Sequence, residues 1–205
     1  MSDVRQLVAR APLRTIRTGD LAAVYANPHK EARELVRRGL LHRLAHGFYC
    51  AVPAEFDAQA WRPTIEAAAA GIATAAYGDR VPVLTGLTAA RLHRALPRAI
   101  GEAYVAVPAQ HRPIRLADRD GMVRFVTRDV AALDAELITN DLGPALVTTP
   151  EQTVLDLAHR DPGGVDLDAR QAIDAMWAGC DQDLLDELAA RQRMRATLER
   201  VRARA

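Results

Sequence analysis

The 205-residue sequence is very poor in several reactive residue types, and each scarcity excludes a kind of site. Lys30 is the single lysine, and the remaining basic side chains are arginine or histidine. A P-loop and a kinase site each need a lysine at a defined place in their motif. Lys30 lies in neither motif, and one lysine in a predicted basic helix also rules out a nuclease signature of the acid-x-lysine type. The sequence therefore excludes these lysine-dependent sites.

Cysteine is equally scarce. Cys50 and Cys180 stand far apart, which predicts neither a disulfide framework nor a metal site. The six histidines show no ligand spacing, and the common motifs of metalloproteases, thiol oxidoreductases and serine hydrolases are missing. We therefore predict a protein that is not an enzyme, with no catalytic residues, no metal and no cofactor.

Long apolar runs are missing as well. A membrane-spanning helix needs about 20 consecutive apolar residues, and no stretch approaches this length. The apolar residues between Val4 and Ala11 are interrupted by Arg5, Gln6 and Arg10, so no secretion signal is indicated. We expect a cytoplasmic protein without a membrane partner.

Charge is balanced over the whole chain but is unevenly distributed. Residues 1–50 contain nine Lys or Arg and four Asp or Glu, which gives 9 − 4 = +5. The whole chain carries +1, so residues 51–205 carry 1 − 5 = −4. This asymmetry predicts a basic module that faces a polyanion and a second module with another role.

The stretch from Asn27 to Pro53 indicates which polyanion. Asn27 is a favoured helix cap, Pro28 suits the first helical position, and Gly39 suits the residue after the last turn. Leu40 to Ala51 then has the pattern of a hairpin with a turn at His46-Gly47. A basic helix followed by a two-stranded wing is typical of a winged helix-turn-helix, which binds DNA.

Basic side chains gather on the solvent face of this helix, opposite the apolar face. At about 100° per residue, that face carries Lys30, Arg33 and Arg37. Arginine can read guanine through a bidentate pair of hydrogen bonds, worth about 1–3 kcal/mol of base discrimination. We therefore predict DNA contacts here. The alternative is a solvated helix face in which Glu34 pairs with Arg37 or Arg38.

Further candidate contacts flank the basic helix. Arg38 lies elsewhere on the helix and is predicted to meet a phosphate or Glu34. Arg43 and His46 belong to the wing, which commonly contacts the minor groove or the flanking backbone. Arg17 and Thr18 precede a second predicted helix over residues 20–24, whose start is suited to a phosphate.

Other residues of the wing have different predicted roles. His42 alternates with Arg43 along the strand, so only one of the two is expected to face DNA. Phe48 and Tyr49 are predicted to anchor the hairpin in the core.

The remainder of the chain predicts a mixed α+β fold. The charge balance changes near Pro53, so we place a winged helix-turn-helix domain at 1–52 and an α+β domain with a helical C-terminal tail at 53–205. Periodicity and turn residues predict helices near 63–77, 85–96, 149–158, 168–178 and 181–190, and strands near 103–107, 113–116, 122–127, 137–140 and 145–147.

Three phrases of the sequence resemble the AbiEi antitoxin family of bacterial type IV toxin–antitoxin systems. The first runs from Leu35 to Leu41 and continues with His42-Arg43 and Gly47-Phe48-Tyr49. The second is Leu84 to His93, and the third is Val147 to Ala158. The three stand in the family's order and span most of residues 15–160.

The resemblance implies two activities. One is repression of the protein's own operon through inverted repeats in promoter DNA. The other is neutralisation of a nucleotidyltransferase-type toxin, often without a stable complex. Inverted repeats favour two copies of the reader, so we expect a monomer in solution or a dimer on DNA.

Two alternatives stay open. In the first, residues 53–205 form a ligand- or partner-sensing domain of an ordinary winged-helix regulator. In the second, the winged fold is a protein-interaction adaptor that binds no nucleic acid.

The arginine-rich run from Arg191 to Arg204 is predicted to contact DNA or toxin, or else to form a solvated helix face.

Overall fold

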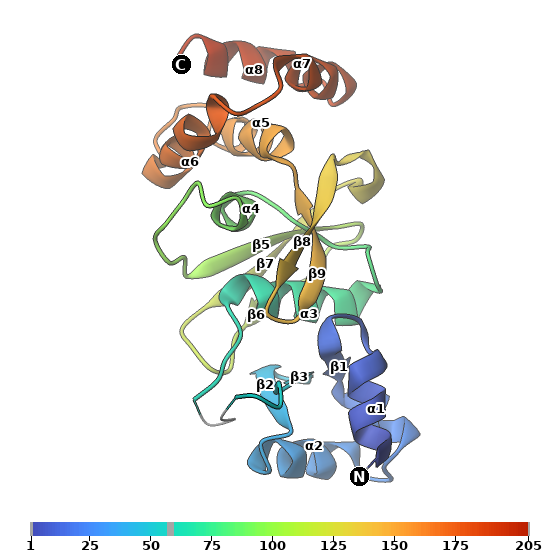
Figure 1. Cartoon of the computed structure of the whole chain (residues 1–205). Helices are drawn as coiled ribbons and strands as arrows, with labels where there is room; N and C mark the ends of the chain where they lie inside the picture. Colours follow the sequence, from blue (N-terminus) through green and yellow to red (C-terminus); the bar gives the residue numbers. More distant parts are fainter. Residues whose placement is uncertain (1, 57–59, 205) are drawn as a thin grey trace.

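The computed structural model describes residues 2–56 and 60–204. These residues form a stack of layers (Figure 1). The N-terminal winged module lies at one end, a mixed sheet with its helices lies in the middle, and the C-terminal helices lie at the other end. The two termini are therefore at opposite ends of the molecule.

The winged module is built around a small sheet. Its three-stranded antiparallel sheet has the strand order β1-β3-β2. The elements are α1 (Ser2–Arg10), β1 (Thr15–Arg17), a 3-10 helix (Thr18–Ala23), α2 (Pro28–Arg37), β2 (Leu41–Ala45) and β3 (Phe48–Ala51). The basic helix and the hairpin of the sequence prediction are confirmed.

One element of this module differs from the prediction. The segment expected to be an α-helix over 20–24 is a 3-10 helix over Thr18–Ala23. The carboxylate of Asp20 accepts a hydrogen bond from the backbone N–H of Arg17 at 2.7 Å, which tightens the first turn. Short connecting segments between longer elements commonly adopt this tighter 3-10 form.

The centre of the molecule is a six-stranded mixed sheet of order β6-β7-β5-β4-β9-β8. The β4–β9 and β5–β7 pairs are parallel, and the other neighbours are antiparallel. Its strands are β4 (Val83–Leu84), β5 (Glu102–Val107), β6 (Ile114–Arg115), β7 (Met122–Thr127), β8 (Ala135–Asn140) and β9 (Gly143–Thr148).

Helices cover both faces of this sheet. Helix α3 (Ile65–Tyr77) lies on the side of the winged module, whereas α4 (Leu87–Leu92) and α5 (Pro150–Arg160) lie on the other side (Figure 1). Beyond α5 stack α6 (Leu167–Trp177), α7 (Gln182–Arg191) and α8 (Arg195–Arg202). The predicted α+β fold class is confirmed.

Helix α3 joins the winged module to the sheet. Apolar residues of both parts pack around it in one core, including Leu44, Ala45 and Cys50 from the wing. The close approach depends on Gly71, because a Cβ at this position would collide with Thr15 Oγ1. The winged module and the sheet thus share a core through α3.

None of the helices in the described ranges is long and apolar enough to cross a membrane. The two cysteines of these ranges, Cys50 and Cys180, are buried free thiols.

Candidate nucleic-acid interface

Local sequence sets both ends of helix α2. The side chain of Asn27 accepts a hydrogen bond from the backbone N–H of Lys30 at 3.2 Å, and Pro28 occupies the first position of the helix. Gly39 follows the last turn with a φ of +68°, a left-handed conformation that suits glycine. The cap and the glycine therefore hold α2 to its ten residues.

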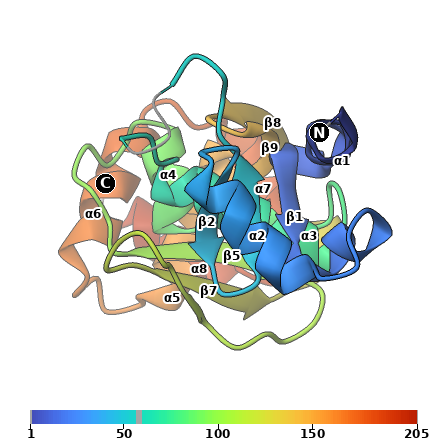
Figure 2. The ribbon, with the colours of Figure 1, turned by 90° about the horizontal axis from the view of Figure 1, so that it is seen from below.

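The two faces of α2 differ as the periodicity predicts. Ala32 and Leu35 are buried in the core of the winged module. Lys30 and Arg33 are exposed on the opposite face, where their side chains have no hydrogen bond or ion pair with residues 2–56 or 60–204. Helix α2 lies at the end of the molecule and is nearest the viewer in Figure 2. Its basic face is therefore open to a large partner.

Arg37 is also exposed on α2, but it has a partner. Its guanidinium lies 2.7 Å from a carboxylate oxygen of Glu34, and 78% of its side chain is exposed. Exposed pairs of this kind contribute only about 0–1 kcal/mol. Arg37 is consequently held loosely, and a phosphate or a base edge can replace Glu34.

The wing presents a second pair of basic groups. Gly47 has a φ of +80° in the turn between β2 and β3. Arg43 and His46 are exposed beside this turn, with Arg43 Nη2 3.5 Å from His46 Nδ1. Two cationic or polar side chains thus project from the tip region of the wing.

The neighbouring His42 faces away from this surface. Its Nε2 lies 2.8 Å from Asp118 Oδ2, and its ring meets Trp61 edge to face at 5.9 Å. The backbone N–H of Ala117 also donates to Leu44 O at 2.8 Å. Of the two alternating residues, Arg43 is the one on the open side, and His42 attaches the wing to the second part of the chain.

Asp118 stays ionised in this contact. Burial alone raises its pKa, but hydrogen bonds from His42 and Arg119 outweigh burial and hold the pKa well below its usual range. Arg119 also lies 2.8 Å from Asp118 Oδ2.

Burial raises the pKa of the nearby Cys50 thiol to about 12, so this thiol stays protonated at neutral pH.

Three further predicted contact residues lie around α2. Arg17 and Arg38 are exposed, Arg38 at the C-cap of α2. Thr18 is buried, and its N–H donates to Gly47 O at 2.9 Å, which supports the wing turn. A phosphate contact of Thr18 stays a prediction.

The sequence prediction missed one exposed residue of α2. His29 lies in the first turn and is exposed like Arg33 and Arg37. The three stand four residues apart, so they form one ridge along the helix. Recognition helices contact bases through their N-terminal residues. The spacing of four residues between His29, Arg33 and Arg37 is therefore the sequence signal from which His29 could have been predicted.

The two later phrases, Leu84–His93 and Val147–Ala158, lie side by side in the structure. Leu84 pairs with Val147 in the parallel β4–β9 ladder. Thr85 Oγ1 donates to Asp156 Oδ2 at 2.8 Å, and His93 Nε2 lies 2.7 Å from Thr148 O. Asp156 also pairs with Arg128 at 3.0 Å. His93 and Asp156 thus both have hydrogen-bond partners within the protein, which is typical of structural roles.

Within the described part of the chain, no group of three or more His, Cys, Asp or Glu side chains is placed to hold a metal ion.

The basic residues are arranged as in a winged helix-turn-helix. The capped helix α2 carries Lys30, Arg33 and Arg37, and the wing carries Arg43 and His46.

Comparison with known proteins relates the winged module to a family of regulators. Residues 2–52 match the model of a family described as "Transcriptional regulator, AbiEi antitoxin". The match supports a transcriptional regulator or antitoxin rather than an enzyme, and it ends at the close of the wing. No curated protein matches the chain.

A solved structure shares the fold. It is the crystal structure of the Rv2827c protein from Mycobacterium tuberculosis, with a TM-score of 0.59 and 20% sequence identity. The alignment covers 97% of this chain and 75% of that chain. The similarity therefore extends beyond the winged module into the mixed sheet and the C-terminal helices.

Proposed function

We propose that this protein is an antitoxin that binds promoter DNA and represses its own operon. One observation carries the proposal. The residues that match the antitoxin regulator family, 2–52, are those of the winged module, whose helix α2 presents Lys30 and Arg33 without a partner inside residues 2–56 or 60–204.

In this proposal α2 enters the major groove. Lys30, Arg33 and Arg37 face base edges, because they lie on the outer side of the helix. Arg43 and His46 on the wing contact the minor groove or flanking backbone. Arg17, Thr18 and Arg38 lie next to phosphates, and inverted repeats bring two copies of the monomer together on DNA.

We assign neutralisation of a nucleotidyltransferase-type toxin to residues 53–205, with or without a stable complex. The resemblance of the β4–α4 and β9–α5 segments to the antitoxin family supports this assignment. Thr85 and Asp156 of these segments are hydrogen-bonded to each other, and Asp156 is also bonded to Arg128 after β7, which supports a role without catalysis. The division at Val52 and Pro53 remains part of the proposal, because α3 packs against both sides of it.

The test uses the full chain and the variant K30Q/R33Q in cells. A reporter behind the protein's own upstream DNA measures repression, and co-expression with the adjacent toxin gene measures rescue. We expect the variant to lose repression and to keep rescue, because the two changes leave the core untouched. Unchanged repression by K30Q/R33Q would sink the DNA assignment, and absence of rescue by the unchanged chain would sink the antitoxin assignment.

A winged-helix regulator with a ligand-sensing second part is the alternative. A hollow between the C-terminal helices favours it.

A further inference from the structure

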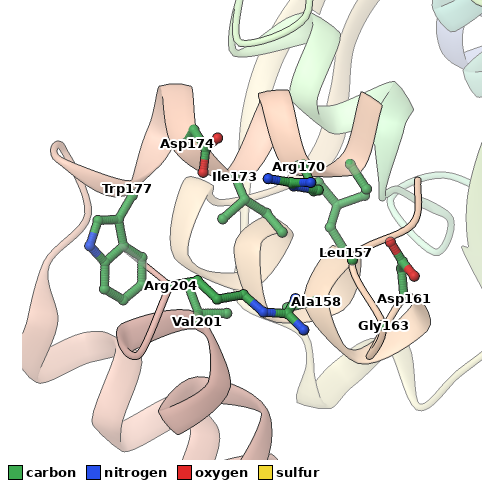
Figure 3. A pocket seen from close by; sticks show the side chains of 12 residues that line it. Leu157, Ala158, Asp161, Gly163, Arg170, Ile173, Asp174, Trp177, Val201 and Arg204 are labelled. Atoms are coloured by element: carbon green, nitrogen blue, oxygen red, sulfur yellow. The ribbon is translucent and has the colours of Figure 1, made fainter. Parts of the chain in front are cut away.

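A hollow of about 620 Å³ opens between α5, α6 and α8 (Figure 3). These helices lie at the end of the molecule away from α2 (Figure 1). Small-molecule sites commonly have volumes of about 300–1,000 Å³ and combine an apolar surface with a few polar groups. This hollow falls in that range and has room for a small organic ligand.

The inner surface of the hollow is apolar. Leu157 and Val201 are buried at its base, and Ile173 and Trp177 are half-buried along its wall. The indole of Trp177 marks one end of the hollow in Figure 3. A flat aromatic group gains both area burial and ring stacking against such a wall.

Two arginines enter the hollow from opposite sides. Arg170 comes from α6 and Arg204 from the residues after α8 (Figure 3). Both approach Gly164, where a Cβ would lie 2.6 Å from Arg204 Nη1 and 3.7 Å from Arg170 Cδ. Gly164 has a φ of +64°, so glycine at this place gives both the turn and the room for Arg204.

Neighbouring acidic groups leave at least one of these charges uncompensated. The carboxylate of Asp161 accepts the backbone N–H of Asp166 at 2.8 Å, and this bond, with a smaller contribution from the charge of Arg204, holds the pKa of Asp161 below its ordinary value. Asp161 therefore compensates part of the charge of Arg204. Arg204 Nη2 donates to Pro162 O at 3.0 Å. Arg170 has no hydrogen bond or ion pair with residues 2–56 or 60–204.

Asp174 is the second acid of the hollow. It is exposed on α6, between Arg170 and Trp177 along the helix, and has no ion-pair partner in the described ranges. A carboxylate beside an aromatic wall accepts a hydrogen bond from an N–H or O–H carried by a ring. The polar groups are therefore complementary to a small molecule that carries both an acid group and a hydrogen-bond donor.

We propose that this hollow binds a small aromatic acid that carries a hydrogen-bond donor on its ring. The ring lies against Trp177 and Ile173. The oxyanion, a carboxylate or a phosphate, accepts hydrogen bonds from Arg170 and Arg204, which recognise such groups by paired donors. Asp174 accepts the hydrogen bond of the ring substituent. This site is separate from the DNA interface and does not depend on it.

The test is calorimetry of the full chain with four probes. 4-Aminobenzoate and 4-aminophenyl phosphate share a ring and a donor and differ in the oxyanion, so they distinguish a carboxylic acid from a phosphate ester. 4-Aminobenzamide lacks the charge, and benzoate lacks the donor. We expect saturable binding of at least one of the two acids with a donor, weaker binding of benzoate, and no binding of 4-aminobenzamide.

Variants assign the binding to this hollow. R170Q is expected to weaken the binding of the two acids by about tenfold or more, because a charge-assisted hydrogen bond is lost. R112Q, which changes an exposed arginine of the loop after β5, is the matched control and keeps full affinity. D174N is expected to reduce the preference for 4-aminobenzoate over benzoate.

A second readout uses fluorescence. The chain has two tryptophans, so W61F leaves Trp177 as the sole indole, and its emission is expected to change on binding. Absence of both heat and an emission change up to about 10 mM of either acid overturns the proposal. Equal affinities of R170Q and R112Q, or equal binding of 4-aminobenzamide, also overturn it. A DNA-binding measurement on the same preparation tests the proposed DNA function separately, so that failure of the ligand proposal is distinguished from failure of the DNA proposal.

Discussion

His42 and Asp118 are 76 residues apart in the chain, and their side chains meet at 2.8 Å. His42 lies on the wing strand β2, and Asp118 lies in the loop between β6 and β7. Together with the hydrogen bond from Ala117 to Leu44, this contact attaches the wing to the central sheet. The orientation of the wing is thus set in part by residues outside the segment that matches the regulator family.

Loss of the Asp118 charge is expected to weaken this attachment. D118N keeps the shape of the side chain but replaces a carboxylate bonded to His42 and Arg119. The side chain is only 11% exposed, so we expect the free energy of unfolding to fall by about 1–3 kcal/mol. Urea unfolding measures it. D120N, which changes the 93%-exposed neighbour, serves as the control and should stay within about 0.5 kcal/mol of the unchanged protein.

The same carboxyl predicts a pH dependence of stability. Burial raises the pKa of Asp118, but hydrogen bonds from His42 and Arg119 lower it more, so its folded pKa lies below the ordinary 3.8. A group with a depressed folded pKa stabilises the fold above its unfolded pKa and loses that contribution as pH falls through the folded value. The stability difference between the unchanged protein and D118N should therefore shrink as pH falls below 3.8. A difference that grows as pH falls below 3.8 contradicts the assignment.

Gly71 tests the packing of α3 against the winged module. A Cβ at Gly71 would meet both Thr15 Oγ1 and, at 3.1 Å, Leu142 Cδ1. We expect G71A to destabilise the protein by about 1–3 kcal/mol, because the added methyl forces two packed elements apart. Thermal unfolding measures the loss. Gly19 has nothing within 4 Å of such a Cβ, so G19A is the matched control, and equal melting of the two variants would count against the shared core.

Glu34 pairs with Arg37 on α2, the helix that we propose to face DNA. E34Q removes the ion pair and one negative charge from the basic face. We expect DNA binding to tighten by about two- to fivefold, with a loss of helix stability of about 0.5 kcal/mol or less. E199Q makes the same charge change on α8 and should leave DNA affinity unchanged. Weaker binding by E34Q than by E199Q would show that the pair itself orients Arg37 for contact.

Local signals were sufficient to predict most elements of the fold. Asn27, Pro28 and Gly39 act within one turn of the residues they fix, so α2 follows from sequence. The alternation in Met122–Thr127 and the cap at Thr149 likewise predict β7 and α5. Both depend on neighbours in the chain and not on distant contacts.

Features set by distant contacts could not be predicted in this way. The partner of His42 lies in a loop whose own sequence carries no signal for it. The strand order depends on β4, a two-residue strand that pairs with β5 and β9 through segments well separated in sequence. The charged hollow combines Arg170 and Arg204, of which only Arg204 lay in the arginine-rich run that the sequence marked. Candidate DNA contacts were predictable as a face of α2, but the burial of Thr18 was not.

The most direct test of the central claim is DNA affinity as a function of salt. Fluorescence anisotropy with a duplex from the protein's own upstream region would compare the unchanged chain, K30Q/R33Q and the control R94Q/R112Q, which changes two exposed arginines outside the winged module. Each phosphate contact contributes about 0.9 to the slope of log affinity against log salt. We predict that K30Q/R33Q binds at least about tenfold more weakly with a smaller slope, whereas R94Q/R112Q keeps the affinity and slope of the unchanged protein. Equal affinity and slope for the two double variants would contradict the assignment of α2 as the DNA-reading helix.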